Sequence, residues 1–238
     1  MIFWTLLLAH VIGDFPLQTD SIYRLKLKSF WGVIPHVAIC TLANILLMKP
    51  FWSNGYVWVA IIFLAVIHAF LDRAKIFVSG LLSKDNLLHF AVDQALHFLS
   101  IWIVSLWLSQ HLDPSRYTLT GIYANRSLII MLTALIFASY GGTPIVYYAQ
   151  KYWINHKASS PIKLYYPSLT ERLPGLLERF IATLAVIGGG WWTLFSVGIF
   201  FPRILFNLDS NSRLLPIVNG IVGFLLSISC GYITKILI

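Results

Sequence analysis

The stretch that decides the fold is LLLAHVIGDFPLQTD, residues 6–20. Its first half is apolar enough for the middle of a membrane span, yet His10, Asp14 and Gln18 follow at four-residue steps. Residues four apart lie about 40° from one another around a helix axis, so on a continuous helix these groups form one polar stripe. Such a stripe points to function only if other apolar segments carry matching groups at the same depth.

The composition of the chain indicates an integral membrane protein. Of its 238 residues, 58% are hydrophobic and 11% are charged, and its mean hydropathy is +0.77. Soluble domains are about 45–50% apolar and about 25% charged. The net charge of +8 is read as a sign of membrane topology, and a nucleic-acid partner is not expected. Cys40 and Cys230 stand in apolar runs, which argues against a disulfide framework or a thiolate metal site.

Seven segments are predicted to span the membrane, since a span needs about 20 mainly apolar residues. They are residues 1–19, 30–48, 56–78, 87–109, 127–149, 176–200 and 214–236. The predicted fold is therefore an all-α polytopic transmembrane helix bundle. Residues 1–110 form a four-span core bearing the histidines and aspartates, and residues 111–238 add three spans with a cytoplasmic loop at about 149–175.

Loop charge predicts an outside N-terminus and a cytoplasmic C-terminus, because Lys and Arg are retained on the cytoplasmic side. One set of loops holds twelve basic residues: Arg24, Lys26, Lys28, Arg73, Lys75, Lys84, Lys151, Lys157, Lys163, Arg172, Arg179 and Lys235. The opposite set holds five: Lys49, Arg116, Arg126, Arg203 and Arg213.

Polar stripes recur on the first four predicted spans. They contain His10, Asp14 and Gln18; then His36; then His68 and Asp72; then His89, Asp93, Gln94 and His97. Each of these aspartates has a histidine four residues before it. With the predicted topology, all four stripes fall in the cytoplasmic half of the bilayer and are expected to converge there.

A buried carboxylate at the bilayer centre costs about 2.5–3.5 kcal/mol, so these groups need partners. A single His-x-x-x-Asp pair is best explained as a self-satisfied ion pair or hydrogen bond. Pairs on several helices at one depth favour a functional site instead, because ionisable groups within membranes mark such sites. Imidazoles and carboxylates suit a divalent Zn, Fe or Mn ion, which would activate water if one coordination position stays open.

The predicted site follows from this pattern. Asp14, Asp72 and Asp93 are the expected catalytic groups, and His10, His68, His89 and His97 are the expected metal ligands. Gln18, His36, Gln94, Glu178 and Arg179 are expected to support them. His89, Asp93 and His97 share one helix face, but the outer pair is about 12 Å apart along the axis, so ligands from other helices are needed.

Several motifs in this order resemble an uncharacterised prokaryotic membrane protein family, domain-of-unknown-function family 3307. They are AHVIGDFPLQTD, the basic loop after it, His36, the His68/Asp72 pair, DQALH from Asp93 and GLLERF from Gly175, with most of the match in residues 1–110. The resemblance implies a prokaryotic inner (plasma) membrane location and membrane lipids as partners. The His/Asp layout is similar in style to membrane-bound metal-dependent hydrolases, which favours a metal site by analogy.

Two functions of different classes fit the pattern. A metal-dependent hydrolase would act on a lipid-like or phosphorylated amphiphile at the cytoplasmic leaflet. A proton- or metal-ion-coupled transporter would need polar groups that continue toward the outer face, where these spans are nearly all apolar. The hydrolase is therefore the preferred hypothesis, and a structural or assembly role in a membrane complex remains a third.

Overall fold

The computed structural model describes residues 1–81, 86–157, 164–206 and 214–238. Within these ranges all regular structure is helical, which confirms the predicted all-α class. Five helical segments are long and apolar enough to cross a membrane: Phe30–Leu47, Gly55–Leu81, Leu87–His111, Arg126–His156 and Leu215–Leu237. Lys84, Lys163 and Arg213, used above to predict the topology, lie outside the described residues.

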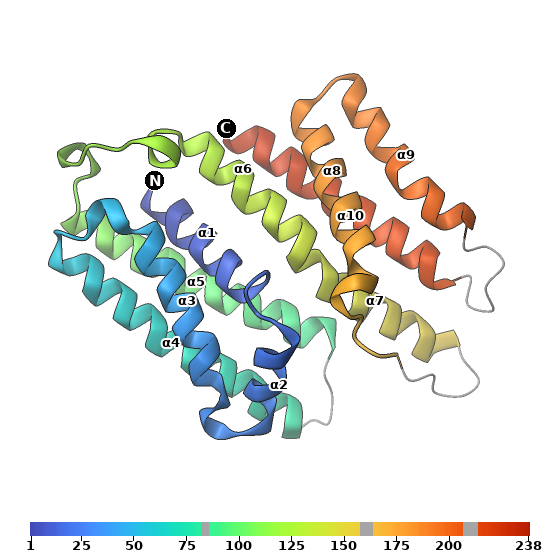
Figure 1. Ribbon diagram of the computed structural model, residues 1–238, viewed down its shortest axis with the longest axis horizontal. Coiled ribbons are helices and arrows are strands. Elements are labelled where there is room, and N and C mark those ends of the chain that lie inside the picture. Colours follow the sequence, from blue (N-terminus) through green and yellow to red (C-terminus); the bar gives the residue numbers. More distant parts are fainter. Residues whose placement is uncertain (82–85, 158–163, 207–213) are drawn as a thin grey trace. The chain divides into compact units, whose positions relative to one another are not determined.

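The chain divides into two compact units, Met1–Thr133 and Ala134–Ile238. The helices of the first unit are α1 (Ile2–Asp14), α2 (Asp20–Lys28), α3 (Ile34–Leu47), α4 (Gly55–Leu81) and α5 (Leu87–His111). The short 3-10 turns η1 (Phe30–Val33) and η2 (Lys49–Phe51) lie before and after α3, and η3 (Pro114–Arg116) and η4 (Gly121–Ala124) follow α5. Both α1 and α4 pack against α3 and α5, so these four helices enclose one interior (Figure 1).

The helix that carries His10 and Asp14 is shorter than predicted. It ends at Asp14, because Pro16 has no N–H with which to continue the helix. Gln18 therefore lies beyond the helix, and the predicted stripe of three groups on one helix is wrong. The basic segment that follows, expected as a loop, is the helix α2, whose first turn is capped by the Thr19 hydroxyl accepting from the Ile22 N–H.

One glycine allows α1 and α3 to approach closely. A Cβ atom on Gly13 would lie 2.8 Å from Cys40 Sγ and 2.9 Å from Cys40 Cα. Only a residue without a side chain fits at that distance. The contact brings the end of α1, with Asp14, against the first turns of α3, with His36.

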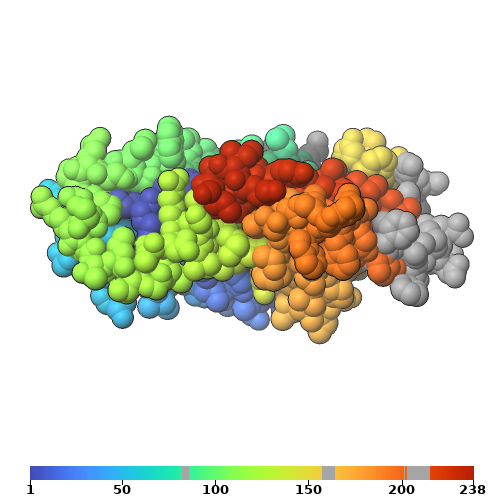
Figure 2. All heavy atoms as spheres, turned by 90° about the horizontal axis from the view of Figure 1, so that it is seen from above, coloured from blue at the N-terminus to red at the C-terminus, as the bar shows by residue number. Residues whose placement is uncertain are grey.

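The second unit begins inside the helical run Arg126–His156. That run consists of α6 (Arg126–Ile136), the π-helical turn η5 (Phe137–Gly141) and α7 (Gly142–Lys157). It is followed by α8 (Leu169–Gly188), α9 (Trp191–Phe206) and α10 (Leu214–Leu237). The helix α10 packs on α7, α8 and α9, and its contact with α8 is visible in Figure 2.

Two boundaries predicted in this half are corrected. The described part of the expected loop 149–175 is largely helical, since α7 runs to Lys157 and α8 begins at Leu169, while residues 158–163 lie outside the described residues. The single span predicted over 176–200 is wrong, because Gly189 and Gly190 adopt φ of 73° and 56° and separate α8 from α9. Backbone in this left-handed region suits glycine, and after the break α9 packs back on α8.

Candidate functional site

The polar groups of the first unit meet in the interior between α1, α3, α4 and α5. Asp14, His36, Asp72 and His97 are buried, as are His10, His68, Asp93 and Gln94. They come from the end of α1, the first turn of α3, the second half of α4 and the first half of α5. The predicted convergence of stripes from four helices is therefore found in the structure. These eight side chains, together with Lys26, Lys75 and Cys40, are called the polar cluster below.

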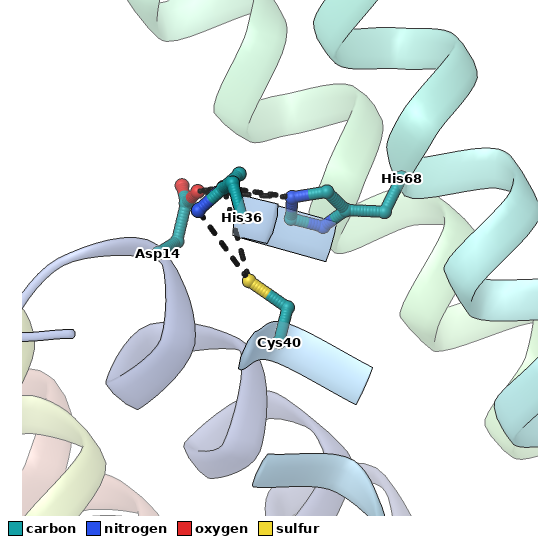
Figure 3. Close-up of side chains that lie close together, drawn as sticks. All are labelled: Asp14, His36, Cys40 and His68. Carbon is teal, nitrogen blue, oxygen red and sulfur yellow. Dashed lines mark hydrogen bonds and ion pairs between the residues drawn. The ribbon is translucent and has the colours of Figure 1, made fainter. Parts of the chain in front are cut away.

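His36 and His68 form the centre of the polar cluster. Their Nε2 atoms lie 3.1 Å apart, and Asp14 Oδ1 lies 3.0 Å from His36 Nε2 and 3.9 Å from His68 Nε2. Figure 3 shows the His36 ring between Asp14 and His68, with Cys40 close by. The Cys40 Sγ is 3.8 Å from His36 Nε2. The shortest His–Asp contact thus joins two helices, not residues four apart on one helix.

Asp72 approaches the same histidine pair. Its Oδ2 lies 3.5 Å from His68 Nε2 and 3.6 Å from His36 Nε2, while its Oδ1 accepts a 2.6 Å ion pair from Lys26 Nζ. Lys26 reaches this point from α2, outside the long helices. Burial alone would lower the pKa of Lys26, but the carboxylates of Asp72 and Asp14 outweigh it, so this pKa is raised above its ordinary value.

Asp93 and Gln94 extend the polar cluster along α5. Lys75 Nζ lies 3.1 Å from Asp93 Oδ2, and Gln94 Nε2 donates to Asp14 Oδ2 at 2.8 Å. His97 Nδ1 lies 2.8 Å from the Asp93 carbonyl and 3.6 Å from its Oδ1. Because a carbonyl only accepts, this contact assigns the hydrogen of a neutral His97 ring to Nδ1.

Four predicted site residues fall elsewhere. Gln18 donates to the Asp14 carbonyl from the turn after α1. His89, half-buried near the start of α5, belongs to neither of the two groups of ligand atoms that lie within 4.8 Å of one another. Glu178 and Arg179 are on α8 in the second unit.

Arg179 binds the π-helical turn of its own unit. Its guanidinium donates to the carbonyls of Ala138 and Ser139, at 2.9 and 2.7 Å, and to Thr143 Oγ1 at 2.8 Å. A π-helical turn disturbs the regular bonding of helix carbonyls, and the donors of one arginine can satisfy several of them. Gly142 leaves space for this side chain, since a Cβ there would lie 2.7 Å from Arg179 Nε.

Lys26, Lys75 and Cys40 were missed as members of the site. The lysines were counted as loop charges and the cysteine as packing. Lys75 could have been found, because it follows Asp72 by three residues and shares its helix face. Lys26 could not, since its approach depends on how α2 packs on η1 and α3, which spacing alone does not reveal.

The polar cluster can hold a metal ion. Two groups of residues each bring their ligand atoms within 4.8 Å of one another. The first group is Asp14, His36, Cys40 and His68, and the second is His68, Asp72 and His97. Tetrahedral ligands at 2.0–2.1 Å from Zn²⁺ are separated by about 3.3 Å. The 3.1 Å His36–His68 separation, with carboxylate oxygens 3.0–3.9 Å from these nitrogens, is of that size.

The charges of the polar cluster also favour a further cation. The carboxylates of Asp14, Asp72 and Asp93 face the ammonium groups of Lys26 and Lys75. One negative charge is left over when all imidazoles are neutral. A buried charge without compensation is costly, so a proton or a metal ion is stabilised here.

Residues 2–122, just over half of the chain, match the family described as "Protein of unknown function (DUF3307)". The chain belongs to this family. No curated protein and no solved structure gives a significant match. The DUF3307 region runs from α1 past the end of α5, so it contains every member of the polar cluster, whereas Glu178 and Arg179 lie outside it.

Proposed function

We propose that this DUF3307 protein is a membrane-embedded metal-dependent hydrolase. The observation that carries the proposal is the 3.1 Å approach of His36 Nε2 to His68 Nε2, with the Asp14 carboxylate beside His36 and the Asp72 carboxylate beside His68. A single hydrogen on His36 Nε2 can be donated to only one of the three atoms that face it. A metal ion between these atoms would satisfy all of them at once.

The ligand set fits Zn²⁺, Fe²⁺ or Mn²⁺, which accept imidazole and carboxylate ligands together. His36, His68 and one carboxylate give three protein ligands, the number that leaves a catalytic zinc an open position for water. When bound, such an ion would lower the pKa of a water molecule and so supply hydrolytic chemistry. A carboxylate of the polar cluster would take the proton that this water gives up and return it to the leaving group, as the bond from that group to the carbonyl carbon or phosphorus of the substrate breaks.

An amphiphilic substrate is supported by the surroundings of the polar cluster. An apolar groove of about 430 Å³ runs along α3 and is lined by Ile34, Val37, Ala38, Thr41, Leu42, Ile45 and Ala69. Lys26 and Lys75 are already paired with Asp72 and Asp93, so the groove is the feature that supports an amphiphilic substrate. We infer a lipid-like or phosphorylated substrate, and a membrane orientation with the N-terminus outside.

The test is the metal content of the full chain, purified without chelator, measured by elemental mass spectrometry. Wild type should hold about one transition metal per chain, and His68→Ala should hold only background metal. His111→Ala is the matched control, because His111 lies at the far end of α5, bonded to the Trp107 carbonyl. Hydrolysis of amphiphilic esters and phosphates is then assayed on the loaded protein. Metal-free wild type, or undiminished metal in His68→Ala, contradicts the proposal.

A second candidate is a proton-coupled transporter, favoured by the succession of close contacts from Asp14 through His36 and His68 to Asp72 and Lys26. Such chains of ionisable groups relay protons in membranes. This function predicts proton flux into proteoliposomes by a protein that holds no metal.

A further inference from the structure

A small cavity adjoins the polar cluster. Its volume is about 20 Å³, and it is lined by His10, Val37, Cys40, Thr41, Asn44, Leu64, Ala65, His68, His97, Ser100 and Ile101. A cavity needs a volume of about 10–15 Å³ and two to four polar partners to hold one water molecule. The volume therefore suits a single water molecule.

Three of the lining residues supply the polar partners. His97 Nε2 and Asn44 Oδ1 are buried and have no hydrogen-bond partner among the described residues, and His10 Nε2, 4.0 Å from Asp14 Oδ2, makes no hydrogen bond of ordinary length. His97, Asn44 and His10 are only 2%, 8% and 3% exposed. An unsatisfied buried polar atom costs about 1–3 kcal/mol, so three around one cavity indicate a bound molecule that satisfies them.

The hydrogen bonds around the cavity also set the orientation of that molecule. His97 carries its hydrogen on Nδ1, which faces the Asp93 carbonyl, so His97 Nε2 offers a lone pair. Asn44 Nδ2 donates to the Cys40 carbonyl at 3.0 Å, which leaves Asn44 Oδ1 as an acceptor. A water molecule between them donates one hydrogen to each, and its oxygen stays free to accept from His10 or to bind a cation.

We infer that this cavity is a water-binding site built by His10, Asn44 and His97, and that it holds water beside the His36–His68 centre. His68 lines the cavity and also belongs to that centre, so the two sites adjoin. The role as a supply of hydrolytic water rests on the proposed function, while the water site itself does not. None of the three residues was assigned this role by spacing, which placed His10 and His97 as metal ligands and Asn44 as packing.

The experiment is NMR spectroscopy of the full chain in lipid nanodiscs with isotope-labelled histidine rings. We expect a neutral His97 ring with its hydrogen on Nδ1, and magnetisation transfer from a long-lived water molecule to the rings of His10 and His97. Asn44→Leu removes one acceptor and fills the cavity, so the transfer should be lost. Asn44→Val gives the same readout should Asn44→Leu fail to fold.

The control is Thr5→Val, which replaces another buried polar group of the same unit whose hydroxyl bonds the Met1 carbonyl. It should keep the water signal. A hydrogen on His97 Nε2, a missing signal in wild type, or a signal unchanged in both Asn44 variants overturns the water site. Metal content separates the two proposals, since Asn44 is no ligand and its variants should keep the metal. A water signal in metal-free wild type would uphold the water site and refute the hydrolase.

Discussion

The position of Asp14 against His36 depends on a residue with no side chain. Gly13 lets α1 approach α3 at Cys40, one residue from the carboxylate that contacts His36 Nε2. The geometry of the polar cluster is therefore set by a backbone contact as much as by the ionisable groups themselves.

Gly13→Ala should destabilise the first unit and loosen the Asp14–His36 contact. The new Cβ would meet Cys40 Cα, a backbone atom that cannot move aside without shifting α3. Overpacking of this kind costs about 1–3 kcal/mol. Denaturant unfolding measures the cost, and metal content reports the geometry. Gly80→Ala, in α4 with open space around the added Cβ, should leave both unchanged or slightly raise stability.

Lys26→Met should be strongly destabilising, because it leaves the Asp72 carboxylate buried beside no ammonium group. Breaking one partner of a buried ion pair costs about 3–5 kcal/mol. The double variant Lys26→Met/Asp72→Asn should recover much of this loss, which a double-mutant cycle of unfolding free energies measures. Equal destabilisation by the single and double variants would show that Lys26 stabilises through packing and not through charge.

The same ion pair predicts a pH dependence. The pKa of Lys26 is raised in the folded chain, so its contribution to stability is fully present below the ordinary value of 10.5. It is lost as the pH rises through the raised folded-state pKa. The free energies of unfolding of wild type and Lys26→Met, measured across alkaline pH, should converge only above pH 10.5.

At the scale of elements, the break between α8 and α9 depends on two glycines with positive φ. Gly190→Ala should cost about 1–2 kcal/mol, because the left-handed region is strained for a residue with a Cβ. Gly189→Ala should cost more, since its Cβ would also lie 2.8 Å from Lys235 Nζ. Thermal unfolding measures both. Gly198→Ala, in α9 with open space and ordinary φ, is the control; a loss as large in this variant would disprove the role of the glycine break.

The sequence predicted the long helices well and their interruptions poorly. The segments 56–78 and 87–109 agree with α4 and α5, because an apolar run of that length forms a helix whatever its partners. Hydropathy does not register how Pro16 ends α1 or how Gly189 and Gly190 end α8. The convergence of Asp14, His68 and His97 could be predicted from spacing, whereas Lys26 enters the polar cluster only through the packing of α2 on η1 and α3.

At the scale of the whole molecule, bound metal should stabilise the fold. A ligand whose free concentration is 100 times its dissociation constant adds about 2.7 kcal/mol to the free energy of unfolding of the folded form that it binds. Adding Zn²⁺ to chelator-treated protein should therefore raise the unfolding temperature of wild type but not of His68→Ala. Because the chain has two compact units, the unfolding of each unit is followed separately. Only the unfolding temperature of the first unit should rise. An equal rise in His68→Ala would indicate binding elsewhere.

The short first helix has a consequence for the surrounding lipid. With 13 residues, α1 is about 20 Å long, whereas the hydrocarbon core of a bilayer is about 30 Å thick. If α1 alone crosses the membrane, its helix ends about 10 Å short of the surface of an undeformed bilayer. Hydrophobic mismatch of this kind is relieved by thinning of the adjacent leaflet, which brings headgroups and water toward α2. The acyl-chain length of the host lipid would then govern how readily Lys26, and the polar cluster beneath it, meets the aqueous phase.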